Sequence, residues 1–219
     1  MTVKTITLPF RYDQVGSLLR SSNLTEAREQ YKTGTITQDQ LINVENNEII
    51  RLIEKQKENG VLAITDGEFR RSWWHFDFLG GLDGVEYYEK EKGLEFHQME
   101  TRKEGIRIIG EIGFTTHPFV QHFEFLKQHA GEAVVKQTIP SPNMLIRRVD
   151  MNEEVYQDKE EFKQDIIVAY QNAIQAFYDA GCRYLQLDDT AWADLFSEEG
   201  HEKLRAKGLD PAEELVLMQ

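Results

Sequence analysis

The sequence predicts an α/β fold in which parallel strands alternate with helices. Amphipathic stretches with an apolar residue at every third or fourth position are followed by short apolar runs, and this unit occurs twice, far apart in the chain. The hydrophobic content of 40% supplies enough apolar side chains for a substantial core in 219 residues. Alternating helices and strands are typical of βα units, whose parallel sheet either closes into a barrel or stays open.

The first of these helix–strand repeats covers residues 37–65. Thr37 and Gln40 have the spacing of a capping box, which predicts that a helix begins there. Its apolar positions follow the helical period as far as Gly60, a typical residue after a helix. The next residues, VLAIT, are apolar on both faces and predict a buried parallel strand at 61–65.

The second helix–strand repeat covers residues 159–188. Six apolar residues fall on one stripe of its predicted helix: Phe162, Ile166, Ala169, Tyr170, Ala173 and Phe177. Gly181 ends this helix, and CRYLQL then predicts a strand at 182–188. Further strands are predicted at 12–17, 106–112 and 133–139, so that five strands are expected in all.

One segment interrupts this alternation within an expected single domain over residues 1–219. Residues 84–105 are highly charged and have glycine near both ends. The segment is either a solvated excursion or a flap over the mouth of a ligand site.

Charge and composition exclude several classes of partner. The 38 acidic and 25 basic residues give a net charge of −13, which opposes binding to nucleic acid. The apolar stretches are far shorter than the ~20 residues of a membrane helix, and the first residues do not resemble a signal peptide. The single cysteine, Cys182, excludes an internal disulfide and is expected to be a buried structural thiol. We therefore expect a cytoplasmic protein.

Polar residues gather where the predicted strands end, which is where parallel α/β folds bind their ligands. The residues concerned are Gly16, Ser17, Asp66, Glu68, Ser141, Asp188 and Asp189. We expect them to converge on a small polar ligand.

The acids also have structural interpretations. Asp66-Gly67 is a common turn dipeptide whose carboxylate accepts local N–H groups, whereas Glu68 is expected to face a ligand. Of Asp188 and Asp189, one is expected to face the ligand and the other to cap the next helix.

The residues that follow Glu68 are expected to pack and pair. Arg70 and Arg71 are predicted to pair with nearby acids, and Trp73 and Trp74 to anchor the turn, while the roles of His75 and Asp77 stay open. Three other histidines are predicted to lie at the surface, because their spacing matches no compact metal motif: His117, His122 and His129.

Four stretches, in order, resemble the cobalamin-independent methionine synthase family: LPFRYDQVGSLLR, ITDGEFRRSWWHFDFL, IPSPNML and YDAGCRYLQLDDTAWADL. The likeness is to short bacterial members that match the catalytic C-terminal half of the full synthase. It implies a (β/α)8 TIM-type barrel, of which this chain would supply about the first five strands. It also implies transfer of a methyl group from a folate to the thiolate of homocysteine.

The resemblance assigns contacts to the substrate. Gly16 and Ser17 correspond to the turn that binds the carboxylate of homocysteine. Glu68 corresponds to an acid that binds the amino-acid head, and Asp188 to the acid that binds its ammonium. Ser141 falls on the side of the methyl donor, but the family tryptophan expected near it is missing, so the folate donor stays open.

The resemblance also implies zinc, held by a His, two Cys and a Glu. These ligands are expected beyond residue 219, so we expect the chain to be the N-terminal portion of a longer barrel and inactive by itself, with no metal ligand or catalytic group assigned within it. Zinc would hold the thiolate as a Lewis acid. Alternatives are alkyl transfer to another small thiol, or metal-independent glycoside hydrolysis by Glu68 and Asp188.

Overall fold

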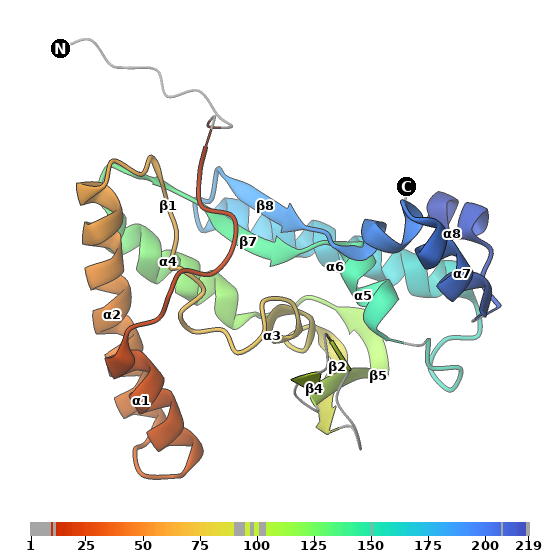
Figure 1. Ribbon diagram of the computed structural model, residues 1–219, viewed down its shortest axis with the longest axis horizontal. Helices are drawn as coiled ribbons and strands as arrows, with labels where there is room; N and C mark the ends of the chain where they lie inside the picture. Colours follow the sequence, from red (N-terminus) through yellow and green to blue (C-terminus); the bar gives the residue numbers. More distant parts are fainter. Residues whose placement is uncertain are drawn as a thin grey trace. The chain divides into compact units, whose positions relative to one another are not determined.

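The structure is a computed structural model of a mixed α/β chain (Figure 1). It describes residues 10, 12–89, 95–96, 99–100, 104–149, 151–206 and 208–217. Two compact units divide the chain. The first comprises Met1–Asp77, Thr116–Thr138 and Ala173–Gln186, and the second comprises Phe78–Thr115, Ile139–Asn172 and Leu187–Gln219. The prediction of a single domain over 1–219 stays a prediction.

The first unit packs helices against a short pair of strands. Its own elements are α1 (Ser22–Lys32), α2 (Gln38–Glu58), β1 (Ala63–Ile64), α4 (Pro118–Ala130) and β6 (Val134–Val135). β1 and β6 pair in parallel, so the predicted strand at 61–65 is confirmed. The buried cluster between these elements consists of Leu24, Ile49, Ile53, Ile64, Phe69, Leu126 and Ala130.

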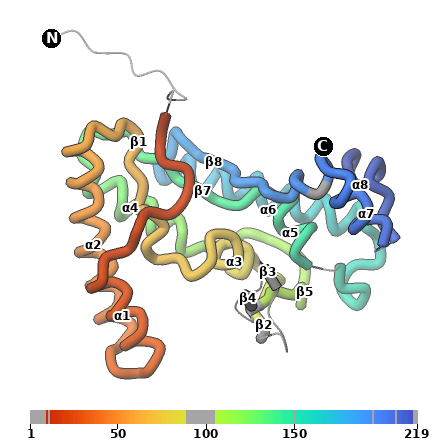
Figure 2. The backbone as a smooth tube through the Cα atoms, in the orientation of Figure 1, coloured from red at the N-terminus to blue at the C-terminus, as the bar shows by residue number. Residues whose placement is uncertain are grey.

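Helix α2 begins and ends as its sequence predicts. The Thr37 hydroxyl accepts a hydrogen bond from the Gln40 N–H at 3.3 Å, and the Gln40 side chain accepts one from the Thr37 N–H at 2.8 Å. This capping box satisfies two N–H groups that a helix start otherwise leaves without partners. Figure 2 traces the chain from α1 into α2, whose buried residues include Leu41, Ile49 and Ile53.

Besides α3 (Phe76–Leu79), three elements contribute residues to both units: β7 (Gln137–Pro140), α6 (Lys159–Asp179) and β8 (Leu185–Asp188). All six residues of the predicted α6 stripe are buried. β7 pairs with β8, and the bonds from Gln137 N to Tyr184 O and from Ser141 N to Asp188 O advance in the same direction along both strands, as in a parallel pair. The strands predicted at 133–139 and 182–188 are therefore confirmed, the first one divided into β6 and β7.

The second unit is built on an antiparallel pair. β2 (Asp83–Glu89) pairs with β5 (Glu104–Gly113), with a bulge between Asp83 and Val85. Gly84 in this bulge has φ +75°, and a Cβ there would lie 2.2 Å from the Glu111 carbonyl oxygen, so the position requires glycine. The remaining elements are α3 (Phe76–Leu79), which begins in the first unit, β3 (Glu95–Phe96), β4 (Met99–Glu100), α5 (Pro142–Arg148), η1 (Ala191–Leu195), α7 (Glu198–Ala206) and α8 (Pro211–Leu217).

Two predicted parallel strands are wrong. Residues 12–17 are irregular, and residues 106–112 lie in β5, which is antiparallel to β2. In β5 the buried Ile106 and Ile108 alternate with more exposed residues, a pattern that suits a hairpin with one buried face. The charged segment 84–105 thus begins with a strand.

The flap proposed for this segment stays a prediction, because residues 90–94, 97–98 and 101–103 lie outside the described part of the chain. Among the residues that are described, no helix has the length and apolar character needed to cross a membrane.

Candidate substrate site

The turn that follows β1 presents Glu68. The Asp66 carboxylate accepts a hydrogen bond from the Glu68 N–H at 2.8 Å, which confirms that Asp66 shapes the turn. Gly67 has φ +64°, and Glu68 itself has φ +58°, which is uncommon for a residue with a Cβ. Such a conformation costs about 1–3 kcal/mol and persists only where surrounding contacts impose it.

Arg71 supplies those contacts. Its buried guanidinium donates to Glu68 Oε1 at 3.1 Å, and to the carbonyl and hydroxyl oxygens of Thr138 at 2.6 and 3.0 Å. The Thr138 hydroxyl also donates to Glu68 Oε1, at 3.3 Å. The guanidinium lies over the Phe119 ring, 4.6 Å from its centre. A buried acid is thus held by a cation and a hydroxyl at a strand end.

The predicted pairing of the arginines is confirmed. Arg70 contacts Glu45 at 3.3 Å, and Arg28 donates to the Phe69 carbonyl oxygen at 2.6 Å and contacts Glu45 as well. Burial raises the pKa of Glu45 even though both arginines oppose the rise. These contacts fasten the turn to α1 and α2.

Gly16 and Ser17 lie in the irregular segment before α1 and are exposed. The next residue, Leu18, donates its N–H to the Gly67 carbonyl oxygen at 3.1 Å. Arg20 donates to the Glu68 and Arg71 carbonyl oxygens, both at 2.7 Å. The structure therefore brings the predicted carboxylate-binding turn and the Glu68 turn together in the first unit.

Three further residues that the sequence analysis did not identify hold the start of this segment: Asp13, Lys136 and Tyr184. The Lys136 ammonium donates to the Asp13 carboxylate and to the Gln14 carbonyl oxygen, both at 2.8 Å, and the Tyr184 hydroxyl donates to the same carboxylate. The available signal was a single lysine inside an apolar strand pattern, VVKQTI, where a charged side chain is costly unless it is paired.

The second acidic strand end lies in the second unit. Asp189 accepts hydrogen bonds from the Ala191 N–H at 2.8 Å and from the side chains of Asn143 and Trp192, both at 2.9 Å. Asp189 is therefore the acid that caps the following helical turn, η1. Asp188 is half-buried, and its carbonyl oxygen accepts the Ser141 N–H at 2.8 Å. Its role toward the substrate stays a prediction.

Ser141 lies at the junction of β7 and α5. The residue is buried, and no residue that the structure describes contacts its hydroxyl with a hydrogen bond. The Tyr170 hydroxyl lies 3.0 Å from the Pro140 and Ser141 carbonyl oxygens and rigidifies this junction. The predicted donor-side role of Ser141 stays a prediction.

The aromatic residues after Glu68 pack together. His75 is buried and stacks on Trp73, with ring centres 5.7 Å apart, and Trp74 contacts it as well. Asp77 accepts hydrogen bonds from the N–H groups of Ser72 and Trp73 at 2.6 and 2.9 Å. The packing role expected of the tryptophans is confirmed, and Asp77 has a structural role.

The surface location predicted for the other histidines is wrong for His117, which is buried and accepts the Phe119 N–H at the start of α4. His122 and His129 are half-buried. Burial, followed by the charge of Arg70, lowers the pKa of His122 to about 4. Their sequence spacing gave no sign of these aromatic and cationic surroundings.

Cys182 is the buried thiol that the sequence predicts, and burial raises its pKa, which disfavours the thiolate that binds metals. Within the described ranges, no three His, Cys, Asp or Glu residues lie close enough to hold a metal ion. Cys182 and the acids and histidines of the described ranges therefore do not fit a zinc site.

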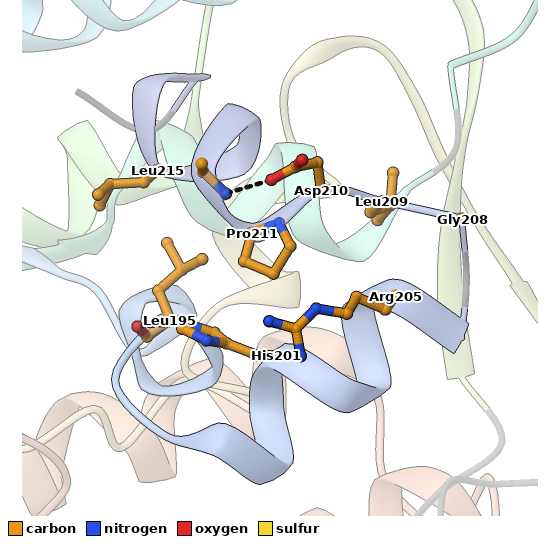
Figure 3. Close-up of a pocket in the computed structure, with 9 residues that line it drawn as sticks. Leu195, His201, Arg205, Gly208, Leu209, Asp210, Pro211 and Leu215 are labelled. Atoms are coloured by element: carbon orange, nitrogen blue, oxygen red, sulfur yellow. Dashed lines mark hydrogen bonds between the residues drawn. The ribbon is translucent and has the colours of Figure 1, made fainter.

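A cavity of about 670 Å³ lies in the second unit between η1, α7 and α8 (Figure 3). Its wall combines leucines with His201, Arg205 and Asp210. His201 contacts the Leu195 carbonyl oxygen at 3.0 Å, and Asp210 accepts the Ala212 N–H at 2.7 Å. His201 and Asp210 therefore already bind groups at helix ends, and no predicted site residue lines the cavity, so we place the candidate site at the Glu68 turn.

The fold and the turn together define a class: α/β proteins with polar residues at the ends of their strands. Residues 11–211 match the family model described as the catalytic domain of cobalamin-independent synthase. The chain belongs to the cobalamin-independent methionine synthase family.

Curated relatives extend over a longer chain. The uncharacterized protein YxjG of Bacillus subtilis is 54% identical over 206 residues, which cover 94% of this chain and 54% of the relative. A methionine synthase of Saccharolobus solfataricus is 25% identical over 179 residues, 81% of this chain and 52% of the relative. The chain thus spans about half the length of these relatives.

Two solved structures have a similar fold. A putative vitamin-B12-independent methionine synthase from Listeria monocytogenes matches with a TM-score of 0.75 and 51% identity, over 88% of this chain and 55% of that one. A B12-independent methionine synthase from Shewanella sp. W3-18-1, in complex with selenomethionine, matches with a TM-score of 0.61 and 17% identity, over 79% of this chain and 48% of that one.

Proposed function

We propose that this chain supplies the amino-acid-binding part of an S-methyltransferase that methylates homocysteine. The observation that carries the proposal is the Glu68 turn, where a buried carboxylate is held by Arg71 and lies in the same unit as the Gly16–Ser17 turn. Family membership and the selenomethionine in the Shewanella relative support an amino-acid substrate. The complete protein would be a cytoplasmic (β/α)8 barrel.

The chain's own residues would bind and orient the amino acid. Glu68 would accept hydrogen bonds from the substrate ammonium, while the Gly16 N–H and the Ser17 hydroxyl would donate to its carboxylate. Holding both ends of the amino-acid head fixes the direction of the thiol, and such orientation lowers the barrier to attack on a methyl carbon. Zinc would supply Lewis-acid activation of the thiol in the complete protein.

The test is calorimetric binding of L-homocysteine and L-methionine to the wild-type protein and to Glu68→Gln. The amide keeps the shape of the side chain but removes its charge, so we expect the affinity to fall roughly 10- to 100-fold, as for loss of a hydrogen bond to a charged group.

Glu54→Gln, on the exposed face of α2, is the matched control and should leave the affinity unchanged. Wild-type protein that binds neither amino acid, or a Glu68→Gln variant of unchanged affinity, would overturn the proposal. Binding of a mercapto-sulfonate in place of homocysteine would instead favour alkyl transfer to another thiol.

A further inference from the structure

Lys136 is a fully buried cation at the junction of β6 and β7. Its side chain is 1% exposed, and its ammonium donates to Asp13 Oδ2 and to the Gln14 carbonyl oxygen, both at 2.8 Å. The backbone N–H of Lys136 bonds to the Ile64 carbonyl oxygen at 2.9 Å, which ties it to β1. A buried ammonium is costly to leave unpaired, so Lys136 holds its acceptors, residues 13 and 14, in place.

The Asp13 carboxylate is shared with a second donor. The Tyr184 hydroxyl bonds to the same oxygen, and the Lys136 ammonium lies 5.2 Å from the centre of the Tyr184 ring. Burial alone would raise the pKa of Asp13, but the hydrogen bonds from Lys136 and Tyr184 outweigh it and lower the pKa below its usual value. Asp13 is thus a charged anchor with two fixed partners.

The segment that this anchor holds is otherwise irregular. Gln14 donates its side-chain N–H to the Gly16 carbonyl oxygen at 3.0 Å, which closes a small turn. Just beyond Ser17, Leu18 and Arg20 bond to the carbonyl oxygens of Gly67 and Glu68. The Gly16–Ser17 turn is therefore fixed between Lys136 on one side and the Glu68 turn on the other.

We propose that Lys136 is a positioning residue that sets the spacing between the Gly16–Ser17 turn and Glu68, and thereby selects α-amino acids. This role rests on the proposed function. An α-amino acid carries its ammonium and carboxylate on one carbon, so a site that binds both groups needs its acid and its donors at one defined separation. Lys136 fixes the position of the Gly16–Ser17 turn, which donates to the carboxylate, and does not itself contact the substrate.

The test compares three probes by calorimetry: L-methionine, methylthio-propylamine, which lacks the carboxylate, and methylthio-butanoic acid, which lacks the amine. In Lys136→Met we expect affinity for L-methionine and for the acid to fall roughly tenfold or more. Affinity for the amine, which needs only Glu68, should stay unchanged. Lys127→Met, an exposed lysine whose ammonium bonds to the Ala180 carbonyl oxygen, is the matched control.

An equal loss of affinity for all three probes in Lys136→Met would show a merely structural lysine and would overturn the positioning role. Should that variant fail to fold, Asp13→Asn and Tyr184→Phe weaken the same anchor and should shift the affinities in the same uneven pattern; unchanged ratios in both would also overturn it. Wild-type protein that binds none of the probes would refute the proposed function itself, a result distinct from unchanged selectivity in the variants.

Discussion

At both acidic strand ends of this chain, one of two nearby acids accepts the backbone N–H two residues ahead. After β1 it is the first acid, and after β8 it is the second. After β1, the first acid, Asp66, accepts the N–H two residues ahead at 2.8 Å, while the second acid, Glu68, is buried against Arg71. After β8, the second acid, Asp189, accepts the N–H two residues ahead, also at 2.8 Å, which leaves Asp188 at the strand end. In each pair, the acid that makes this contact is the structural one.

The two ends differ in what supports them. Glu68 depends on a buried ion pair with Arg71, whereas Asp189 is held by neutral donors from Asn143, Ala191 and Trp192. Removing one partner of a buried ion pair leaves the other charge buried and unpaired, which is costly. Removing one neutral donor to a carboxylate costs only a hydrogen bond. The Glu68–Arg71 ion pair should therefore be the contact most sensitive to loss of one partner.

The largest effect is expected at Arg71. Arg71→Met leaves the Glu68 carboxylate buried without its cation, which should lower the free energy of unfolding by about 3–5 kcal/mol. Urea denaturation measures this change. Arg51→Met, which removes an exposed partner of Glu48, should cost less than about 1 kcal/mol. Equal losses in the two variants would contradict the importance of burial.

Alanine substitutions of the two structural acids compare the strand ends directly. Asp189→Ala removes three hydrogen bonds and should lower the free energy of unfolding by about 2–3 kcal/mol. Asp66→Ala removes the contact to the Glu68 N–H and should cost about 1–2 kcal/mol. Denaturation of both variants under the same conditions tests this order, and a larger loss for Asp66→Ala would reverse the comparison.

The first strand end should also respond to pH through His122. Burial and the charge of Arg70 lower its pKa to about 4, while Asp66 opposes them. The pKa of His122 in the folded protein lies below its unfolded value of ~6.5, so neutral His122 contributes to the free energy of unfolding. This contribution is fully present above pH ~6.5 and is lost as the pH falls through about 4.

We expect a loss on the order of 2 kcal/mol over that range, measured as the free energy of unfolding against pH. His122→Gln should remove this component of the acid dependence, whereas His201→Gln, in the second unit, should retain it. An identical pH profile in His122→Gln and wild-type protein would exclude His122 as the cause.

The smallest effect is expected at Trp192. Trp192→Phe keeps an aromatic ring but removes the N–H that donates to Asp189, so it should lower the free energy of unfolding by about 1 kcal/mol. A double-mutant cycle with Asp189→Ala isolates the coupling between the two side chains. Additive effects of the two substitutions would show that this hydrogen bond contributes nothing measurable.

Local sequence predicted much of the secondary structure. The α2 capping box joins residues three apart, and the apolar stripe of α6 repeats every three to four residues, so both depend only on near neighbours. Strand pairing is less local. The prediction failed for residues 106–112, because the sequence does not say which partner a strand finds or in which direction it runs.

The sequence by itself determined helices α2 and α6, the parallel strand at 61–65, and the tendency of Asp66-Gly67 to form a turn. Only the tertiary structure decided that Arg71 reaches Thr138 and that Lys136 reaches Asp13, pairs separated by 67 and 123 residues. The physical reason is that a turn or helix start is stabilised by groups within a few residues, whereas a buried charge takes whatever partner the fold brings beside it.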